Sequence, residues 1–551
     1  MIEKPEKPPV IGKTRILILG AGLMQGPALQ IAAEMGLETV AADINPGAVC
    51  VPMAKRFEKV DLKDKDGILT LARTLMEQGG LGGIMTAGTD FTPSVAWAAE
   101  KLGLSGLDFE TALDASDKER MRRRFKAAGL SSPEFVIFDK LPEKNFQLPF
   151  SWPAVVKPVD NMGSRGCRRV DSSEELETAV SEALKFSRSG RVIVEQYMDG
   201  PEFSVDALVY QGEIIICGLA DRHIFFPPYF IEMGHTIPSS LDPETTRNLL
   251  ETFKRGVKAL GINNGAAKGD IKLTKQGPAI GEIAARLSGG YMSGWTFPYS
   301  SGVLPTKGAI EIALGKKPAK LEPQWNWVCA ERAFISIPGK VRSIQGVEFA
   351  KIRPWVKNVF LNIRQGSQVS FPENNVSKCG NILSAAAERY DAISSAETAA
   401  RSILIRLEAP NKETKDFLSV NPGKERFPPD AFPLDEQLLS TLKSLPDPFE
   451  SPIPPCPPCS PCFPPCLLDL RVLNFPQFLD SGLTDYVGRS VQETLDAVRT
   501  LTGLDLPIAD NAAENDEKKA FLLGRSFWQA LIRGGYQGAV YYIDLLRGEN
   551  D

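Results

Sequence analysis

The chain has 551 residues, 43% of them hydrophobic and 24% charged, and carries a formal net charge of −5 at pH 7. This balance gives no overall attraction to nucleic acid or anionic lipid, so we expect neither as a partner. No uncharged apolar run could span a bilayer, and residues 1–10 lack the apolar core of a signal peptide. We therefore expect a cytoplasmic protein. Only two histidines occur, which excludes HExxH metalloproteases and most histidine-rich zinc sites.

Residues 15–110 alternate short β-rich runs with amphipathic helical patterns, which is typical of a parallel sheet covered by helices. The first run ends in a glycine turn at Gly20 and Gly22, and Asp43 closes the next expected strand. This arrangement is compatible with a dinucleotide site in which Asp43 binds a ribose. It is equally compatible with glycines that only let a strand pack close to a helix. An NAD-dependent oxidoreductase therefore stays an alternative at this point.

A second glycine loop lies between two expected strands in residues 153–170, and Lys157 is on the first of these strands. Glycine lets main-chain N–H groups approach an oxyanion closely. The order strand–loop–strand indicates a lid over phosphates, although an ordinary glycine hairpin gives the same pattern. The candidate lid residues are Gly163, Ser164, Arg165 and Gly166.

Residues 268–286 predict a β-hairpin that turns at Lys275-Gln276-Gly277. Asp270 and Glu282 are equally far from Gln276, so the hairpin places them directly opposite each other on one face. A divalent cation shared with phosphates would remove the repulsion between the two carboxylates. A slipped register, or neutralisation by Lys272, is the alternative.

A third element runs from a strand ending at Glu195–Met198 to Glu202, just after a Gly-Pro turn. It offers main-chain groups for an adenine edge and a carboxylate for ribose hydroxyls.

These elements, in this order, resemble the ATP-grasp superfamily from about residue 15 to about residue 407. The chain is most similar to the carboxylate–amine ligases and the related carbamoyl-phosphate synthase and biotin carboxylase domains. The resemblance implies a mixed α/β and α+β fold. Its parts are a Rossmann-like pre-ATP-grasp domain (1–110), an ATP-grasp catalytic domain (111–320) and a C-terminal ATP-grasp subdomain (321–408).

The resemblance also implies site residues, with ATP and Mg²⁺ as cofactors and Mn²⁺ as an alternative metal. It implies that Lys157 and Arg286 are catalytic and that Asp270 and Glu282 bind the metal. It implies that the nucleotide is bound by Lys118, Lys157, Gly163, Ser164, Arg165, Gly166, Glu195, Gln196, Tyr197, Met198, Glu202 and His235. Two departures from the family pattern are Asp270, where most relatives carry Glu, and Ala284, where many carry an Asn that contacts a second metal.

The activity expected from the resemblance is an ADP-forming ligase that activates a carboxylate as an acyl phosphate for attack by an amine. The partners are then small-molecule carboxylate and amine substrates, with a homodimer as one possible assembly. A nucleotide-binding regulatory protein without turnover is an alternative, favoured by Asp270 and Ala284. Activation of bicarbonate, as in carbamoyl-phosphate synthase or biotin carboxylase, is another.

Residues 409–470 are rich in proline and polar residues and predict a linker. Four cysteines at 456, 459, 462 and 466 have the spacing of half a ferredoxin site, but proline fills every gap, which favours a low-complexity expansion. Residues 471–551 predict a helical extension of unknown role with apolar faces.

Overall fold

The computed structural model describes residues 14–143, 146–319, 321–424, 426–446, 470–504, 508–509 and 521–548. The chain divides into two compact units, Met1–Glu331 with Ala385–Ile393, and Arg332–Ser384 with Ser394–Asp551. Throughout the described ranges, every helix is too short or too polar to cross a lipid bilayer.

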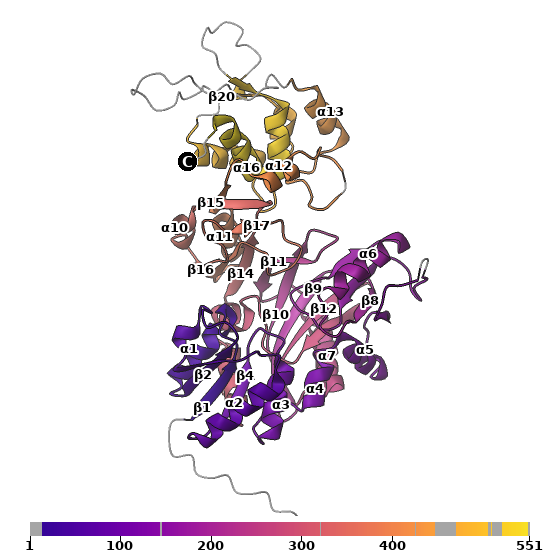
Figure 1. Ribbon diagram of the computed structural model, residues 1–551, viewed down its shortest axis with the longest axis vertical. Helices are drawn as coiled ribbons and strands as arrows, with labels where there is room; N and C mark the ends of the chain where they lie inside the picture. The colour runs from indigo at the N-terminus through magenta and orange to yellow at the C-terminus, as the bar shows by residue number, and fades with distance from the viewer. Residues whose placement is uncertain are drawn as a thin grey trace, which may run out of the picture. The chain divides into compact units, whose positions relative to one another are not determined.

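The first unit begins with a parallel sheet of order β3-β2-β1-β4, drawn in indigo in Figure 1. Its strands are β1 Arg15–Leu19, β2 Glu38–Asp43, β3 Arg56–Lys59 and β4 Gly83–Thr86. The accompanying helices are η1 Leu23–Gln25, α1 Gly26–Glu34, η2 Val51–Met53, α2 Lys65–Glu77 and α3 Thr92–Lys101. The side chains of Ile16–Leu19 are all fully buried, as expected for a parallel strand covered on both faces. The Rossmann-like form expected for this region is confirmed.

A small antiparallel sheet of order β5-β8-β6-β7 follows helices α4 (Phe109–Asp114) and α5 (Lys118–Ala127). Its strands are β5 Phe135–Phe138, β6 Ala154–Pro158, β7 Arg168–Val170 and β8 Val192–Gln196, and helix α6 spans Ser173–Leu184. The apolar side of α6 packs on this sheet through Leu176, Val180 and their neighbours.

A larger antiparallel sheet supplies the rest of this unit, with the strand order β13-β12-β9-β10-β11. The strands are β9 Glu202–Tyr210, β10 Glu213–Phe225, β11 Ile231–Ile237, β12 Asn264–Thr274 and β13 Gly277–Ala284. Helix α7 (Pro243–Leu260) packs on one face, where Phe203, Val205 and Ile271 belong to the same buried core as Phe253. Side chains alternate between faces along a strand, so the neighbouring polar residues Glu202, Ser204, Asp206, Lys268 and Asp270 share the other face. The unit continues with η3 (Met292–Thr296, a π-helix), α8 (Phe297–Ser301) and α9 (Pro305–Ala313).

The second unit holds the end of β14 (Val328–Phe334) and a three-stranded sheet of order β17-β15-β19. Its other early elements are β15 Gly339–Gln345, α10 Val347–Lys351, β16 Val356–Leu361, β17 Gln368–Val369, β18 Gly380–Ala386, α11 Arg389–Ser402 and β19 Leu404–Leu407. Strand β16 pairs antiparallel with β18.

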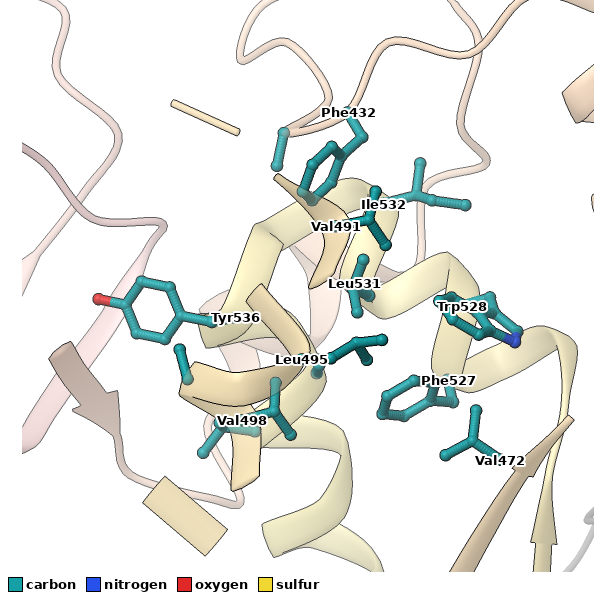
Figure 2. Close-up of a cluster of buried hydrophobic side chains, with 14 of the residues drawn as sticks. Phe432, Val472, Val491, Leu495, Val498, Phe527, Trp528, Leu531, Ile532 and Tyr536 are labelled. Carbon is teal, nitrogen blue, oxygen red and sulfur yellow. The ribbon is translucent and has the colours of Figure 1, made fainter. Parts of the chain in front are cut away.

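The C-terminal helices share one hydrophobic core with this unit. The elements are α12 Lys412–Leu418, α13 Glu436–Ser444, β20 Leu470–Leu473, α14 Pro476–Leu479, α15 Val491–Thr502, β21 Ile508–Ala509, β22 Phe521–Leu523 and α16 Arg525–Arg547. Figure 2 shows Leu495 and Val498 of α15 facing Phe527 and Leu531 of α16.

The segment 409–470 differs from the predicted linker. It contains α12 and α13, and Phe432 between these helices is fully buried in the core of Figure 2. The sequence did not predict that this segment contributes to the hydrophobic core, because its apolar residues are too widely spaced among prolines and polar residues to form a periodic pattern. The cysteines at 456–466 lie outside the described residues.

Candidate active site

A buried carboxylate with two cations lies where β6, β8 and α5 meet. Lys157 Nζ is 2.6 Å from Glu195 Oε2, and Arg122 Nε is 2.8 Å from Glu195 Oε1. Burial raises the pKa of Glu195, but the charges of Arg122 and Lys157 outweigh it and lower the pKa to about 2. The Glu195 side chain therefore orients Lys157.

Lys118 connects the start of α5 with the glycine loop and the hairpin. Its side chain is buried, its Nζ donates to the Asn161 carbonyl at 2.9 Å, and it lies 3.7 Å from Glu282 Oε1. Burial alone would lower the pKa of Lys118, but the charges of Glu282 and Asp90 raise it. A cation is thus fixed beside the predicted metal ligand.

The hairpin brings Asp270 and Glu282 opposite each other, as predicted, by a route that the sequence did not reveal. The turn consists of only Lys275-Gln276, so that Thr274 lies opposite Gly277. In a regular hairpin with this turn, Asp270 would lie opposite Gly281. A β-bulge between Asp270 and Ile271 inserts Gly281 and restores the pairing with Glu282. Arg122 donates to the Gly281 carbonyl and supports this bulge.

Asp270 has two cationic partners that sequence reasoning missed. Arg222 Nη1 is 2.9 Å from Asp270 Oδ1, and Lys268 Nζ donates to Oδ2. Burial raises the pKa of Asp270, and Arg222 and Lys268 overcome this and lower it. Lys272, considered as the neutralising residue, instead lies 3.8 Å from Glu202 Oε2. The contact with Lys268 could have been predicted, because residues two apart on a strand share one face and Lys268 is two residues before Asp270.

Arg222 also donates to Glu202, the predicted ribose carboxylate, and to Glu232. The pairing explains this contact, because Arg222 of β10 lies directly opposite Glu202 of β9 and His235 of β11. One guanidinium therefore joins the predicted metal and ribose positions.

The donor set suits Mg²⁺ that is shared with phosphates. Within the described ranges no group of three or more His, Cys, Asp or Glu side chains could hold a metal alone. Two carboxylates with additional phosphate oxygens are typical of Mg²⁺ at nucleotide sites. Glu282 fits this role because about a third of its side chain is exposed, at 34%, beside Lys118.

The predicted lid, Asn161–Gly166, connects β6 to β7 and has a left-handed backbone at three positions. Gly163, Ser164 and Gly166 all have left-handed φ values of 67°, 59° and 65°. Ser164 Oγ donates to the Phe230 carbonyl at 3.2 Å, and Arg165 Nη1 donates to the Met162 carbonyl at 3.3 Å. A non-glycine residue in this conformation is uncommon and persists where its surroundings fix it.

The predicted adenine segment leaves the small sheet at the end of β8. The Gln196 and Tyr197 N–H groups donate to the carbonyls of Glu134 and Pro153, at 2.9 and 3.1 Å. Met198 lies beyond the strand. The Tyr197 ring lies 5.3 Å from Lys272 Nζ, so this segment is close to the strand face that carries Glu202.

Arg286 contacts a different carboxylate, and His235 joins this network through Glu232, which also accepts from Arg222. Arg286 Nε is 3.1 Å from Asp90 Oδ1, which follows β4 of the Rossmann-like part. His235 is buried with Nδ1 3.1 Å from Glu331 Oε2 and Nε2 3.3 Å from Glu232 Oε1. Burial would lower the pKa of His235, but Glu232 and Glu331 raise it to about 9. Both ring nitrogens thus face carboxylates of the chain.

The space beside the first glycine turn, at Gly20 and Gly22, is occupied by the Gln25 side chain. Gln25 Oε1 accepts from the Gly22 N–H at 2.9 Å, and a Cβ at Gly20 would be 2.9 Å from Gln25 Cδ. The Asp43 oxygens accept from the N–H groups of Ala21 and Asn45, each at 2.9 Å. Asp43 therefore supports the turn, and this geometry does not favour the dinucleotide alternative.

Comparisons with known proteins identify the domains and the fold. A family model described as an ATP-grasp domain matches residues 150–294, and one described as L-amino acid ligase C-terminal domain 2 matches residues 333–408. An uncharacterized protein of Sinorhizobium fredii is 25% identical over 357 residues, 64% of this chain and 74% of that protein. The alanine–anticapsin ligase of Bacillus subtilis is 26% identical over 251 residues, 41% of this chain and 53% of that protein.

The crystal structure of an L-amino acid ligase from Bacillus licheniformis superposes with a TM-score of 0.63 at 24% identity. The match covers 72% of this chain and 99% of that one, and it shows a shared fold. The chain thus has a region that matches an ATP-grasp domain, followed by one that matches L-amino acid ligase C-terminal domain 2, on a fold that it shares with an L-amino acid ligase.

Proposed function

We propose that this chain ligates a carboxylate to an amine with cleavage of ATP to ADP and phosphate. The observation that carries the proposal is the pairing of Asp270 with Glu282 beside Lys118. Relatives such as the alanine–anticapsin ligase support amino acids as the substrate class.

In the proposed reaction a substrate carboxylate oxygen attacks the γ-phosphorus and ADP leaves. The amine nitrogen then attacks the acyl carbon, inorganic phosphate leaves and a proton is released. Catalysis of this type depends on positioning and charge neutralisation and needs no nucleophilic side chain. Lys118 and Lys157 would neutralise the phosphates, and Arg286 would stabilise charge on the transferred group.

Glu282 and Asp270 would hold Mg²⁺, which supplies charge neutralisation on the phosphates when bound. The glycine loop Gly163–Gly166 would cover the phosphates and exclude water from the acyl phosphate. Main-chain groups of Glu195–Met198 other than the Gln196 and Tyr197 N–H groups, which bond to other carbonyls of the chain, would bind adenine. Glu202, oriented by Arg222, would bind the ribose.

The test is a screen of paired amino acids for Mg²⁺-dependent ADP release, with Lys157→Ala and Glu282→Ala as variants. Both variants are expected to lose ADP release while far-UV circular dichroism stays unchanged. Lys140→Ala and Glu213→Ala, at exposed positions, serve as matched controls. Unchanged ADP release in either site variant contradicts the assigned roles.

One observation favours nucleotide binding without turnover as the second candidate. Asp270 is already neutralised by Arg222 and Lys268, so Mg²⁺ has to compete with two cations for this carboxylate. Nucleotide binding without amino-acid-stimulated phosphate release, across the whole substrate panel, would support this candidate over the ligase.

A further inference from the structure

The segment from Arg286 to Thr296 has an unusual backbone for its position in the candidate site. Tyr291 is buried and has φ 66°, in the left-handed region, directly after Gly290 at φ 60°. The π-helix Met292–Thr296 follows at once. Left-handed non-glycine residues and π-helical turns are both uncommon and occur often at functional sites. Such a segment needs specific contacts that fix it.

Asp206, in the middle of β9, makes these contacts. Its Oδ2 accepts from Ser288 Oγ and from Ser293 Oγ, each at 2.6 Å. The Ser288 N–H also donates to Ser293 Oγ at 2.9 Å. All three side chains are at least nine-tenths buried, so one carboxylate oxygen clamps both ends of the turn that contains Gly290 and Tyr291.

The second oxygen of Asp206 lacks a hydrogen-bond partner among the described residues, although it is buried. Burying a carboxylate oxygen without a hydrogen-bond partner costs free energy. An aspartate at this position therefore indicates a functional role in addition to its packing. Asp206 lies directly opposite Lys268 of β12. Burial raises the pKa of Asp206, and the hydrogen bonds from Ser288 and Ser293 only partly offset this. The clamp therefore begins at Ser288, two residues after Arg286, which the proposed function places at the transferred phosphate.

We propose that Asp206, through Ser288 and Ser293, is a positioning residue that fixes the segment Arg286–Thr296 for phosphoryl and acyl transfer. This inference rests on the proposed function. Asp90 restrains the Arg286 guanidinium and the bridge between Ala87 and Leu287 restrains its backbone, while Asp206 fixes the turn that follows. The Asp206 carboxylate accepts hydrogen bonds from both serines of the turn, so its loss should displace the reacting geometry through the turn.

The test compares Asp206→Asn and the double variant Ser288→Ala/Ser293→Ala with the wild-type chain. Ser300→Ala is the matched control, since Ser300 is an equally buried serine of α8 that donates to the Phe297 carbonyl outside the clamp. Two quantities are measured: steady-state ADP release, separated into kcat and KM for ATP, and hydrogen–deuterium exchange of peptides covering residues 286–296.

We expect kcat to fall by about tenfold to a hundredfold in both clamp variants, since small misplacements of reacting groups have effects of this size. KM for ATP should change by less than about twofold, because the nucleotide contacts lie elsewhere. Exchange in residues 286–296 should accelerate while β9 peptides keep their protection. Combining all three substitutions should add nothing to Asp206→Asn, because the residues act as one unit.

Unchanged exchange in residues 286–296 overturns the inference, whether or not the wild-type chain is active. If the wild-type chain releases no ADP with any substrate pair, the proposed function fails, and the exchange measurement still decides whether the clamp exists. A fall in kcat that is matched by Ser300→Ala, or a rise in KM for ATP as large as the fall in kcat, also overturns it.

Discussion

Asp270 and Glu282 lie directly opposite each other on β12 and β13, because a bulge at Gly281 compensates for a turn that is one residue tighter than the sequence suggests. A Cβ at Gly281 would lie 3.0 Å from the Asp270 carbonyl oxygen, so glycine suits the extra residue. The bulged strand is also bonded by Arg122, whose guanidinium reaches Glu195 on the neighbouring sheet. The predicted metal pair and the predicted phosphate-binding Lys157 are therefore linked through one buried arginine.

The buried Glu195 network predicts a stability loss that depends on pH. Glu195→Gln leaves Arg122 and Lys157 without their countercharge, so the free energy of unfolding should fall by about 3 kcal/mol near neutral pH. The folded-state pKa of Glu195 is lowered to about 2, from an ordinary value of 4.5. Its contribution is thus present above about pH 4.5 and is lost as the pH falls towards 2.

Urea unfolding of the wild-type chain and the variant between pH 7 and pH 3 measures this contribution. The control is Glu213→Gln, which breaks an exposed pair with Lys317 and should cost less than about 1 kcal/mol. A difference between the wild-type chain and Glu195→Gln that stays constant over this pH range would contradict the assigned cause.

Alanine substitutions at two glycines with the same backbone conformation should differ in their effect on nucleotide binding, because only one of the glycines lies in the predicted lid. Gly166 and Gly190 have φ values of 65° and 69°, so an alanine at either position is strained. A Cβ at Gly166 would also lie 2.8 Å from Phe186 Cδ2, whereas Gly190 has nothing within 4 Å. Gly166→Ala should weaken nucleotide affinity by about tenfold, through loss of the lid conformation.

Titration calorimetry with ATP and Mg²⁺ compares the two variants. Gly190→Ala is expected to bind the nucleotide as the wild-type chain does, with a small loss of stability. Equal affinities in Gly166→Ala and Gly190→Ala would show that the glycine loop has no part in nucleotide binding.

The parts of the fold that are visible in the sequence are those with local patterns. The run Ile16–Leu19 predicts a buried parallel strand because its own residues are apolar without a break. Lys157, Asp270 and Glu282 could be singled out because their positions follow from strand, loop and turn spacing. Lys157→Ala and Glu282→Ala test the predicted roles of two of these residues.

The partners of these residues could not be predicted, because they depend on pairing between strands far apart in the chain. Arg222 reaches Asp270 only because β9 pairs with both β10 and β12. The clamp of Asp206 on Ser288 depends on the same sheet together with the turn after β13. Phe432 packs edge-on against Phe478, with ring centroids 5.5 Å apart, across a segment that composition alone indicated as a linker.

The C-terminal helices predict a stability contribution within the second unit. Asp544 of α16 is fully buried and accepts two hydrogen bonds from Arg406 of β19, one of them at 2.8 Å from Nε. Tyr536 Oη accepts from the Ile405 N–H at 2.8 Å. Asp544→Ala should lower the free energy of unfolding of this unit by about 3 kcal/mol, because Arg406 loses its buried partner.

Denaturant unfolding measures this effect, with Asp496→Ala as the control at an exposed pair with Arg499. The control should change stability by less than about 1 kcal/mol. A similar small effect for Asp544→Ala would mean that the helical extension folds independently of the strands that precede it.

His235 predicts a titration that is simple to assign, because the chain has only one other histidine, His223. The pKa of His235 is raised to about 9, so the imidazolium is the stable form at neutral pH. A raised folded-state pKa means that the stabilisation is fully present below about pH 6.5 and is lost as the pH rises through 9.

NMR of a histidine-labelled sample should show one imidazole signal with a midpoint near 9. That signal should be absent in His235→Gln and kept in His223→Gln, and the alkaline loss of stability should follow the same pattern. A midpoint near 6.5 for both signals would show that Glu232 and Glu331 do not hold the ring in its charged form.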